Sequence, residues 1–92
     1  MKKHSLKLIE GKFLHTEARE ILTNIYSAKI NFHQMKNFSS MERFGKEDKT
    51  AVKKIPALKK EMNKLEKILL TAKEKNLNLR ITSEINIFLS VD

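Results

Sequence analysis

Residues 14–35 decide the fold, and their sequence is LHTEAREILTNIYSAKINFHQM. Apolar side chains recur there in alternating steps of four and three residues, which is the spacing of one face of a helix. This first seam consists of Leu14, Ala18, Ile21, Ile25, Ala28, Phe32 and Met35. Thr16 is placed to cap the helix, and Glu17 and Glu20 follow where negative charge favours the positive end of the helix dipole. The pattern predicts a helix over residues 16–44.

Two readings are open for the end of this first helix. The apolar positions drift after Met35, and residues 39–42, Ser-Ser-Met-Glu, have the form of a capping box. The helix therefore either continues to about Phe44 or breaks near residues 37–39 and restarts. Gly45 is the natural stop in both cases, because glycine adopts a left-handed conformation without steric cost.

A second helix is predicted over residues 48–75. Its seam consists of Ala51, Ile55, Leu58, Met62, Leu65, Leu69 and Ala72. Asp48 or Thr50 can cap its start, and Asn76 is an acceptable terminator. Pro56 lies inside the pattern, so we expect a kink near residue 56 or a helix start one residue earlier. The seam continues through Pro56, which favours the kink.

The two chain ends are predicted to be extended. After Asn76 the apolar period changes to two, which predicts either one long strand or a β-hairpin over residues 77–91. At the start of the chain, Leu6 and Leu8 alternate with polar residues and predict a short strand over residues 5–10.

These elements predict a single domain, residues 1–92, of the helix-dominated α+β class. Two helices of similar length with a short connection favour an antiparallel hairpin, in which the two seams face each other and form the core. A coiled coil that recruits another helix is the alternative use of the seams, and both hold if the hairpin dimerises. That hairpin brings the start of the first helix beside the end of the second, so the two extended segments can pair. The expected order is β-α-α-β, with a long antiparallel helical hairpin and a small antiparallel sheet formed by the chain ends.

This architecture has few layers in which to bury its apolar faces, and a two-stranded sheet is marginal by itself. Several apolar residues also lie off the two seams and need cover: Ile9, Phe13, Leu22, Tyr26, Ile30, Ile68 and Phe88. We therefore expect a homodimer, formed by a four-helix layer or by the C-terminal strand pairing across a two-fold axis.

The composition excludes several classes of chemistry. The chain has no cysteine, so disulfides, thiolate metal sites and cysteine nucleophiles are absent. No window resembles a signal peptide or a membrane span, which makes the cytoplasm the expected location and a membrane an unexpected partner. We also find no phosphate-binding loop, nucleophile elbow or metal-binding motif, so neither a cofactor nor a metal is expected.

A lysine stripe is the main candidate for contact with nucleic acid or another anion. The net charge is +8, and lysines recur every seven residues opposite the second seam. The stripe consists of Lys46, Lys49, Lys53, Lys60, Lys64 and Lys67. A solvated outer helix face explains the same residues. The nearby acids Glu61, Glu66 and Glu74 and the scarcity of arginine count against nucleic acid.

A polar cluster near the hairpin turn is the second candidate. It consists of Asn31, His33, Gln34, Asn37, Ser39, Ser40, Glu42 and Arg43. The cluster is either a binding patch or a network of caps and turns, which require serine and asparagine in any case. His33 with Glu42 or Arg43 would be the likeliest centre of an enzyme, but no convincing catalytic constellation is present.

The sequence therefore predicts a small non-enzymatic interaction or regulatory protein that acts as a homodimer through helical-hairpin and strand surfaces and binds another macromolecule, for which a protein is one candidate. The alternative is a nucleic-acid-binding accessory protein that uses the lysine-rich helix face.

Overall fold

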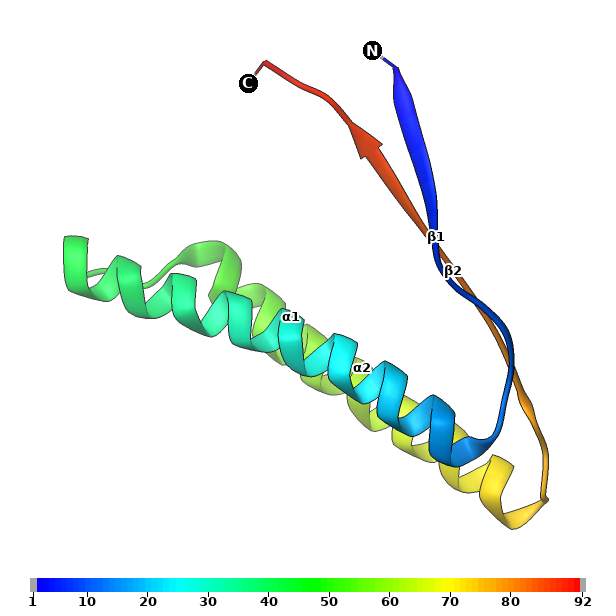
Figure 1. The fold of residues 1–92 in the computed structure, drawn as a ribbon. Coiled ribbons are helices and arrows are strands. Elements are labelled where there is room, and N and C mark those ends of the chain that lie inside the picture. The colour runs from blue at the N-terminus through cyan, green and yellow to red at the C-terminus, as the bar shows by residue number, and fades with distance from the viewer. Residues whose placement is uncertain (1, 92) are drawn as a thin grey trace.

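The computed structural model describes residues 2–91 and has the expected order β-α-α-β (Figure 1). Strand β1 spans Lys3–Phe13, helix α1 spans His15–Phe44, helix α2 spans Lys49–Glu74 and strand β2 spans Leu79–Phe88. The two helices pack as an antiparallel hairpin, and the two chain ends form a two-stranded antiparallel sheet. The predicted helix-dominated α+β fold is thus confirmed.

Helix α2 turns its predicted seam towards α1. Five members of that seam are buried, and the other two, Ile55 and Met62, are partly buried. The buried members are Ala51, Leu58, Leu65, Leu69 and Ala72. Leu69 is the one large side chain that is fully buried within residues 2–91, so the core is small and centred on the C-terminal half of α2.

Helix α1 does not use its predicted seam in this way, and that prediction is wrong. Of the seven seam residues only Ala18 is buried, whereas Leu14, Phe32 and Met35 are each more than half exposed. The inner face of α1 is instead a neighbouring stripe, in which the residues are four apart: Ala18, Leu22, Tyr26 and Ile30. The physical reason is that α1 carries apolar residues on two stripes, and only one of them can face α2.

The helix ends show which residues cap them. Gly45 is left-handed, with φ of 65°, and its N–H donates to the carbonyl of Met41 at 2.9 Å. The Asp48 carboxylate accepts from the N–H of Ala51 at 2.9 Å and caps α2. Asn76 also has a positive φ, and it ends α2 as expected.

Two features of the first helix differ from expectation. Thr16 is not its cap, because α1 begins one residue earlier at His15 and Leu14 takes the cap position. Glu17 still supports this end, since its carboxylate accepts from the N–H of Leu14 at 2.9 Å. Of the two readings for its end, the unbroken one holds, because α1 runs through residues 37–39 to Phe44.

The second half of the chain resolves two further alternatives. Pro56 lies inside α2, so the helix does not begin there. The C-terminal segment is one strand, Leu79–Phe88, rather than a β-hairpin, and it pairs with nearly the whole length of β1.

An irregularity in β1 aligns the apolar faces of the two strands. Ile9 lies opposite Ser83 and Leu6 lies opposite Ile85, so the register shifts between Lys7 and Ile9. Without this bulge, alternation would send Leu6 and Ile9 to opposite faces of the sheet. With it, one face of the sheet is apolar along almost its whole length.

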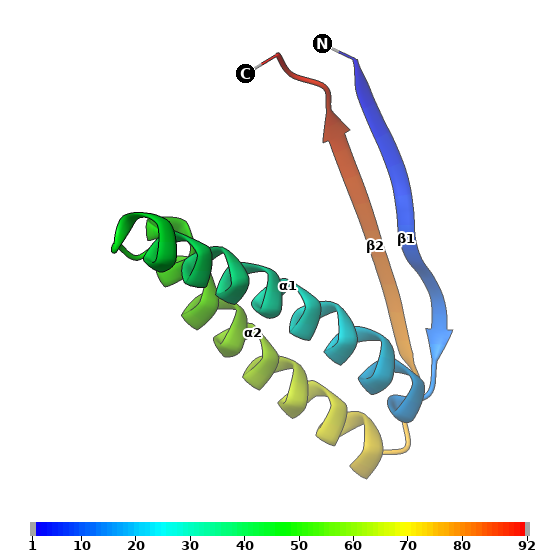
Figure 2. The same cartoon turned by 60° about the vertical axis from the view of Figure 1, so that its left-hand side comes forward.

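The sheet leaves the hairpin as a long arm. Near the open end of the hairpin, Phe13, Leu79 and Ile81 pack against the core of Ala18, Leu65 and Leu69. Beyond this junction the two strands diverge from the helices, and Figures 1 and 2 show the arm and the hairpin as the two limbs of a V. The apolar residues of the outer arm therefore lie uncovered.

This core makes a direct prediction about stability. Replacing Leu69 with alanine removes the fully buried side chain at the junction and should lower the free energy of unfolding by about 2–5 kcal/mol. The neighbouring Leu70 is half exposed, so Leu70→Ala should cost less than about 1 kcal/mol. Urea unfolding followed by circular dichroism measures both. Equal losses for the two variants would contradict the placement of the core.

Candidate functional site

The lysine stripe lies on the outer face of the hairpin. Its residues are all exposed, and five of the six belong to α2, whereas Lys46 lies in the connection before that helix. At 100° per residue they occupy the side of α2 opposite its buried seam. From Lys49 to Lys67 the stripe extends over about 27 Å at 1.5 Å per residue.

Two of the acids that count against nucleic-acid binding turn away from the lysine stripe in the structure. Glu66 turns towards α1, where both of its carboxylate oxygens accept from the guanidinium of Arg19 at 2.6 and 2.7 Å. Glu61 also turns towards α1 and accepts from the Tyr26 hydroxyl at 3.5 Å. Neither acid interrupts the stripe, and none of the stripe lysines forms an ion pair with any residue between 2 and 91.

The polar cluster is divided by the helix that carries it. Because α1 is continuous, successive residues point in different directions around its axis. Two members serve the turn: Asn37 accepts from the N–H of Asp48 at 2.8 Å, and Ser40 donates to the carbonyl of Lys46 at 2.7 Å. Asn31, Gln34, Ser39, Glu42 and Arg43 are exposed.

His33 and Glu42 are not brought together. Nine residues of one continuous α-helix separate them by about 13.5 Å along the axis, and Arg43 lies one residue further from His33. Instead His33 lies beside Phe32, with ring centroids 5.3 Å apart in an edge-to-face arrangement. Its Nδ1 atom is buried and has no hydrogen-bond partner within the part of the chain that the structure describes.

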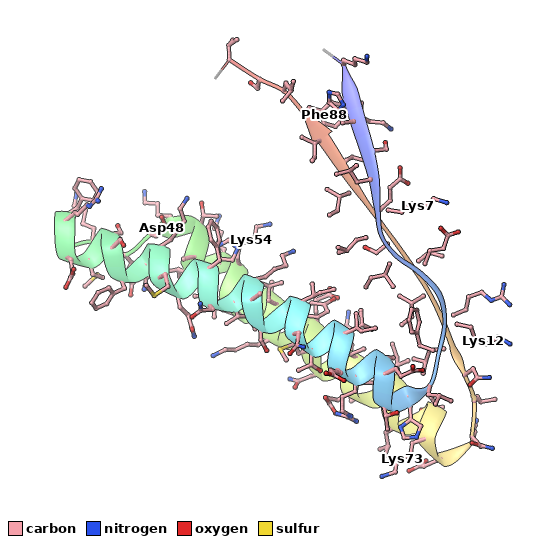
Figure 3. The ribbon with its side chains drawn as sticks, in the orientation of Figure 1. Lys7, Lys12, Asp48, Lys54, Lys73 and Phe88 are labelled. Carbon is pink, nitrogen blue, oxygen red and sulfur yellow. The ribbon has the colours of Figure 1, made fainter. Side chains whose placement is uncertain are left out.

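A polar groove between the helices was missed by sequence reasoning. It has a volume of about 460 Å³ and is lined by Tyr26, Lys29, His33, Lys54, Ala57, Leu58 and Glu61. The sequence spacing contained a signal for this groove. Residues 26, 29 and 33 share one face of α1, and residues 54, 57 and 61 share one face of α2. Its cations could attract an anion, and the Tyr26 hydroxyl and the Glu61 carboxylate lie beside each other there. Figure 3 labels Lys54 among the side chains near this part of the hairpin.

Burial raises the pKa of Tyr26 above the usual 10.0, and the Glu61 carboxylate raises it further by charge and by the hydrogen bond. Folding thus favours the protonated phenol. The stability that this contributes is fully present below pH 10.0 and is lost as the pH rises through the raised value.

The single tyrosine in a chain without tryptophan permits a clean titration. Ultraviolet absorbance should show Tyr26 ionising above pH 10.0 in the folded protein. Glu61→Gln should lower the titration midpoint of Tyr26 part of the way towards 10.0, because the burial of Tyr26 remains when the Glu61 charge is removed. Glu74→Gln, which removes a carboxylate elsewhere on α2, should leave the midpoint unchanged. A Glu61→Gln midpoint equal to that of the wild type would refute the contact.

Residues 2–91 contain no group of three or more histidine, aspartate or glutamate side chains placed to hold a metal ion. In the same range, no helix is long and apolar enough to cross a membrane. Comparison with known protein families, with curated proteins and with solved structures gives no match for this chain. Its function must therefore be argued from its own surfaces.

Proposed function

We propose that the protein is a non-enzymatic interaction protein that acts as a homodimer through surfaces of its helical hairpin and its strands. The observation that supports this proposal is the apolar surface that the single chain leaves uncovered on α1 and on the arm. Large exposed apolar patches on a small protein usually mark a surface that another chain covers.

One part of that surface is the outer stripe of α1, on which Leu14, Ala28, Phe32 and Met35 are exposed and Ile21 and Ile25 are partly buried. Phe32 and Met35 are 56% and 58% exposed. From Ile21 to Met35 the residues alternate in steps of four and three, as in the seam that one helix presents to another in a coiled coil. Helix α2 packs against a different stripe, and within residues 2–91 Phe32 and Met35 are left more than half exposed.

Beyond Met35 the exposed apolar residues turn away from the stripe, because they follow one another in steps of three. Phe38, Met41 and Phe44 are 58%, 46% and 72% exposed, and Phe32 also carries the Lys36 ammonium 5.5 Å from its ring centroid. Aromatic and methionine side chains are enriched at the centres of protein interfaces because they bury large areas and adapt their shape. This end of α1 therefore suits contact with a second protein surface.

The oligomeric state tests the proposal. Size-exclusion chromatography with light scattering should give a dimer at micromolar concentration. Phe32→Glu places a charge in the outer stripe and should weaken the dimer at least tenfold, or about 1.4 kcal/mol. Leu70→Glu places the same charge at a half-exposed leucine of α2 and is the matched control. A compact monomer at this concentration would overturn the proposal.

A second candidate function is nucleic-acid binding through the lysine stripe. The observation that favours it is the orientation of Glu61 and Glu66, which face α1 and leave the outer side of α2 basic from Lys49 to Lys67. Binding of this kind would be electrostatic and independent of sequence, because the stripe contains lysine but no arginine for bidentate contacts to bases.

Labelled duplex and single-stranded oligonucleotides in a salt series test this candidate. Replacing Lys53, Lys60 and Lys67 together with glutamine should lower the affinity at low salt at least tenfold and reduce the salt dependence by roughly 0.9 per lost phosphate contact. Replacing Lys2, Lys29 and Lys36 removes equal charge away from the stripe and should have a smaller effect. Equal losses of affinity in the two variants would show that binding depends on net charge alone. Absence of binding at low salt would rule out this function.

A further inference from the structure

The two edges of the sheet differ in how well they are protected. The β1 edge carries Lys3, Lys7 and Lys12 and is interrupted by the bulge before Ile9. Lysines and bulges are devices that prevent an edge strand from pairing with another chain. Strand β2 is continuous from Leu79 to Phe88 and contains neither lysine, proline nor glycine. The edge of β2 is thus the one that remains open to pairing.

The polar face of β2 carries two charges that form no ion pair with any other described residue. Arg80 lies opposite Lys12, a like charge that disfavours the pair. Glu84 lies opposite Lys7, but the Lys7 ammonium binds Glu10 at 2.9 Å instead. Neither Arg80 nor Glu84 forms an ion pair within residues 2–91. They share a face of β2 but are separated by about 13 Å, so they cannot neutralise each other.

We propose, on the basis of the homodimer proposed above, that two copies of the chain pair antiparallel through the free edge of β2, with Thr82 on the two-fold axis. This register sets Arg80 of each copy opposite Glu84 of the other, twice. On the other face it sets Leu79 opposite Ile85 and Ile81 opposite Ser83. Centring the pair on residue 80 or residue 84 would place like charges opposite each other, which is unfavourable.

The same register covers the outer arm. In each copy the helices cover the junction half of the sheet, where Leu79 and Ile81 pack against the core. The distal half is uncovered, with Leu6, Ile85 and Ile87 at 56%, 37% and 40% exposure. Antiparallel pairing lays the distal half of one arm beside the junction half of the other. Both hairpins then lie on the same, apolar face of a four-stranded sheet in the order β1-β2-β2-β1.

The view with side chains agrees with this arrangement. Figure 3 shows Lys7 and Lys12 extending from the arm on the side away from the helices, and Phe88 near its far end. The lysines are therefore on the polar face, which remains in solvent in the dimer. A sheet of four strands with one apolar face covered by helices is a stable form, whereas a two-stranded ribbon is not.

Cross-linking tests the register, since the chain has no cysteine of its own. Thr82→Cys puts two thiols opposite each other across the axis, within the distance a disulfide spans, so oxidised glutathione should convert most of the protein to a covalent dimer. Asn86→Cys is the control on the same face of β2. It lies opposite Asn78 of the second copy and should cross-link at least tenfold less.

Exchanging the charges at positions 80 and 84 tests the pairing independently. Circular dichroism spectra that match the wild type show that the variants are folded. Arg80→Glu alone and Glu84→Arg alone each set like charges opposite and should weaken the dimer at least tenfold. Mixing these two variants should restore association by forming heterodimers, as should combining both changes in one chain.

The outcomes separate the two proposals. A dimer that neither cross-links at residue 82 nor responds to the charge changes would overturn the β2 pairing and leave the homodimer standing. A monomer would overturn both.

Discussion

The packing of Ala18 against Leu65 and Leu69 is the contact on which the rest of the structure depends. A small residue at position 18 lets the two helix axes approach at the open end of the hairpin, where the strands also arrive. Leu79 and Ile81 of β2 then close the same cluster. Helix packing and strand pairing are thus coupled at one junction. Away from it the described residues form little further core: Ile30, Ala51 and Leu58 are buried nearer the turn, and Ile9 is buried in β1.

The second helix was predictable because its apolar and polar residues fall on clearly separate faces. Every member of its predicted seam is buried or partly buried. The first helix offers two apolar stripes, and the sequence contains no signal that says which of them meets α2 within the chain. The more regular stripe predicts one inner face, yet Leu22, Tyr26 and Ile30 make the observed one. A regular apolar spacing therefore identified a helix surface without identifying its partner.

The same distinction applies to the candidate sites. The lysine stripe was visible because it repeats every seven residues, but the direction of Glu61 and Glu66 depends on partners in α1, far away in the sequence. Serine and asparagine near the turn were ambiguous between binding and capping until Asn37 and Ser40 were seen to satisfy backbone groups. The bulge in β1 had a signal in the sequence, since Leu6 and Leu8 are out of phase with Ile9.

The uncovered surfaces are related by the shape of the molecule. The arm meets the helices at the junction and leaves them beyond it, so the apolar residues on the two limbs of the V do not cover each other. Pairing through β2 resolves this with a closed two-fold contact, and growth of the sheet stops at the outer β1 strands, where lysines and the bulge protect the edges. It also sets the helices of one copy beside those of the other on one face of a sheet. The hairpin and the strands then contribute to a single interface, whereas the basic side of α2, opposite its buried seam, is not required for it.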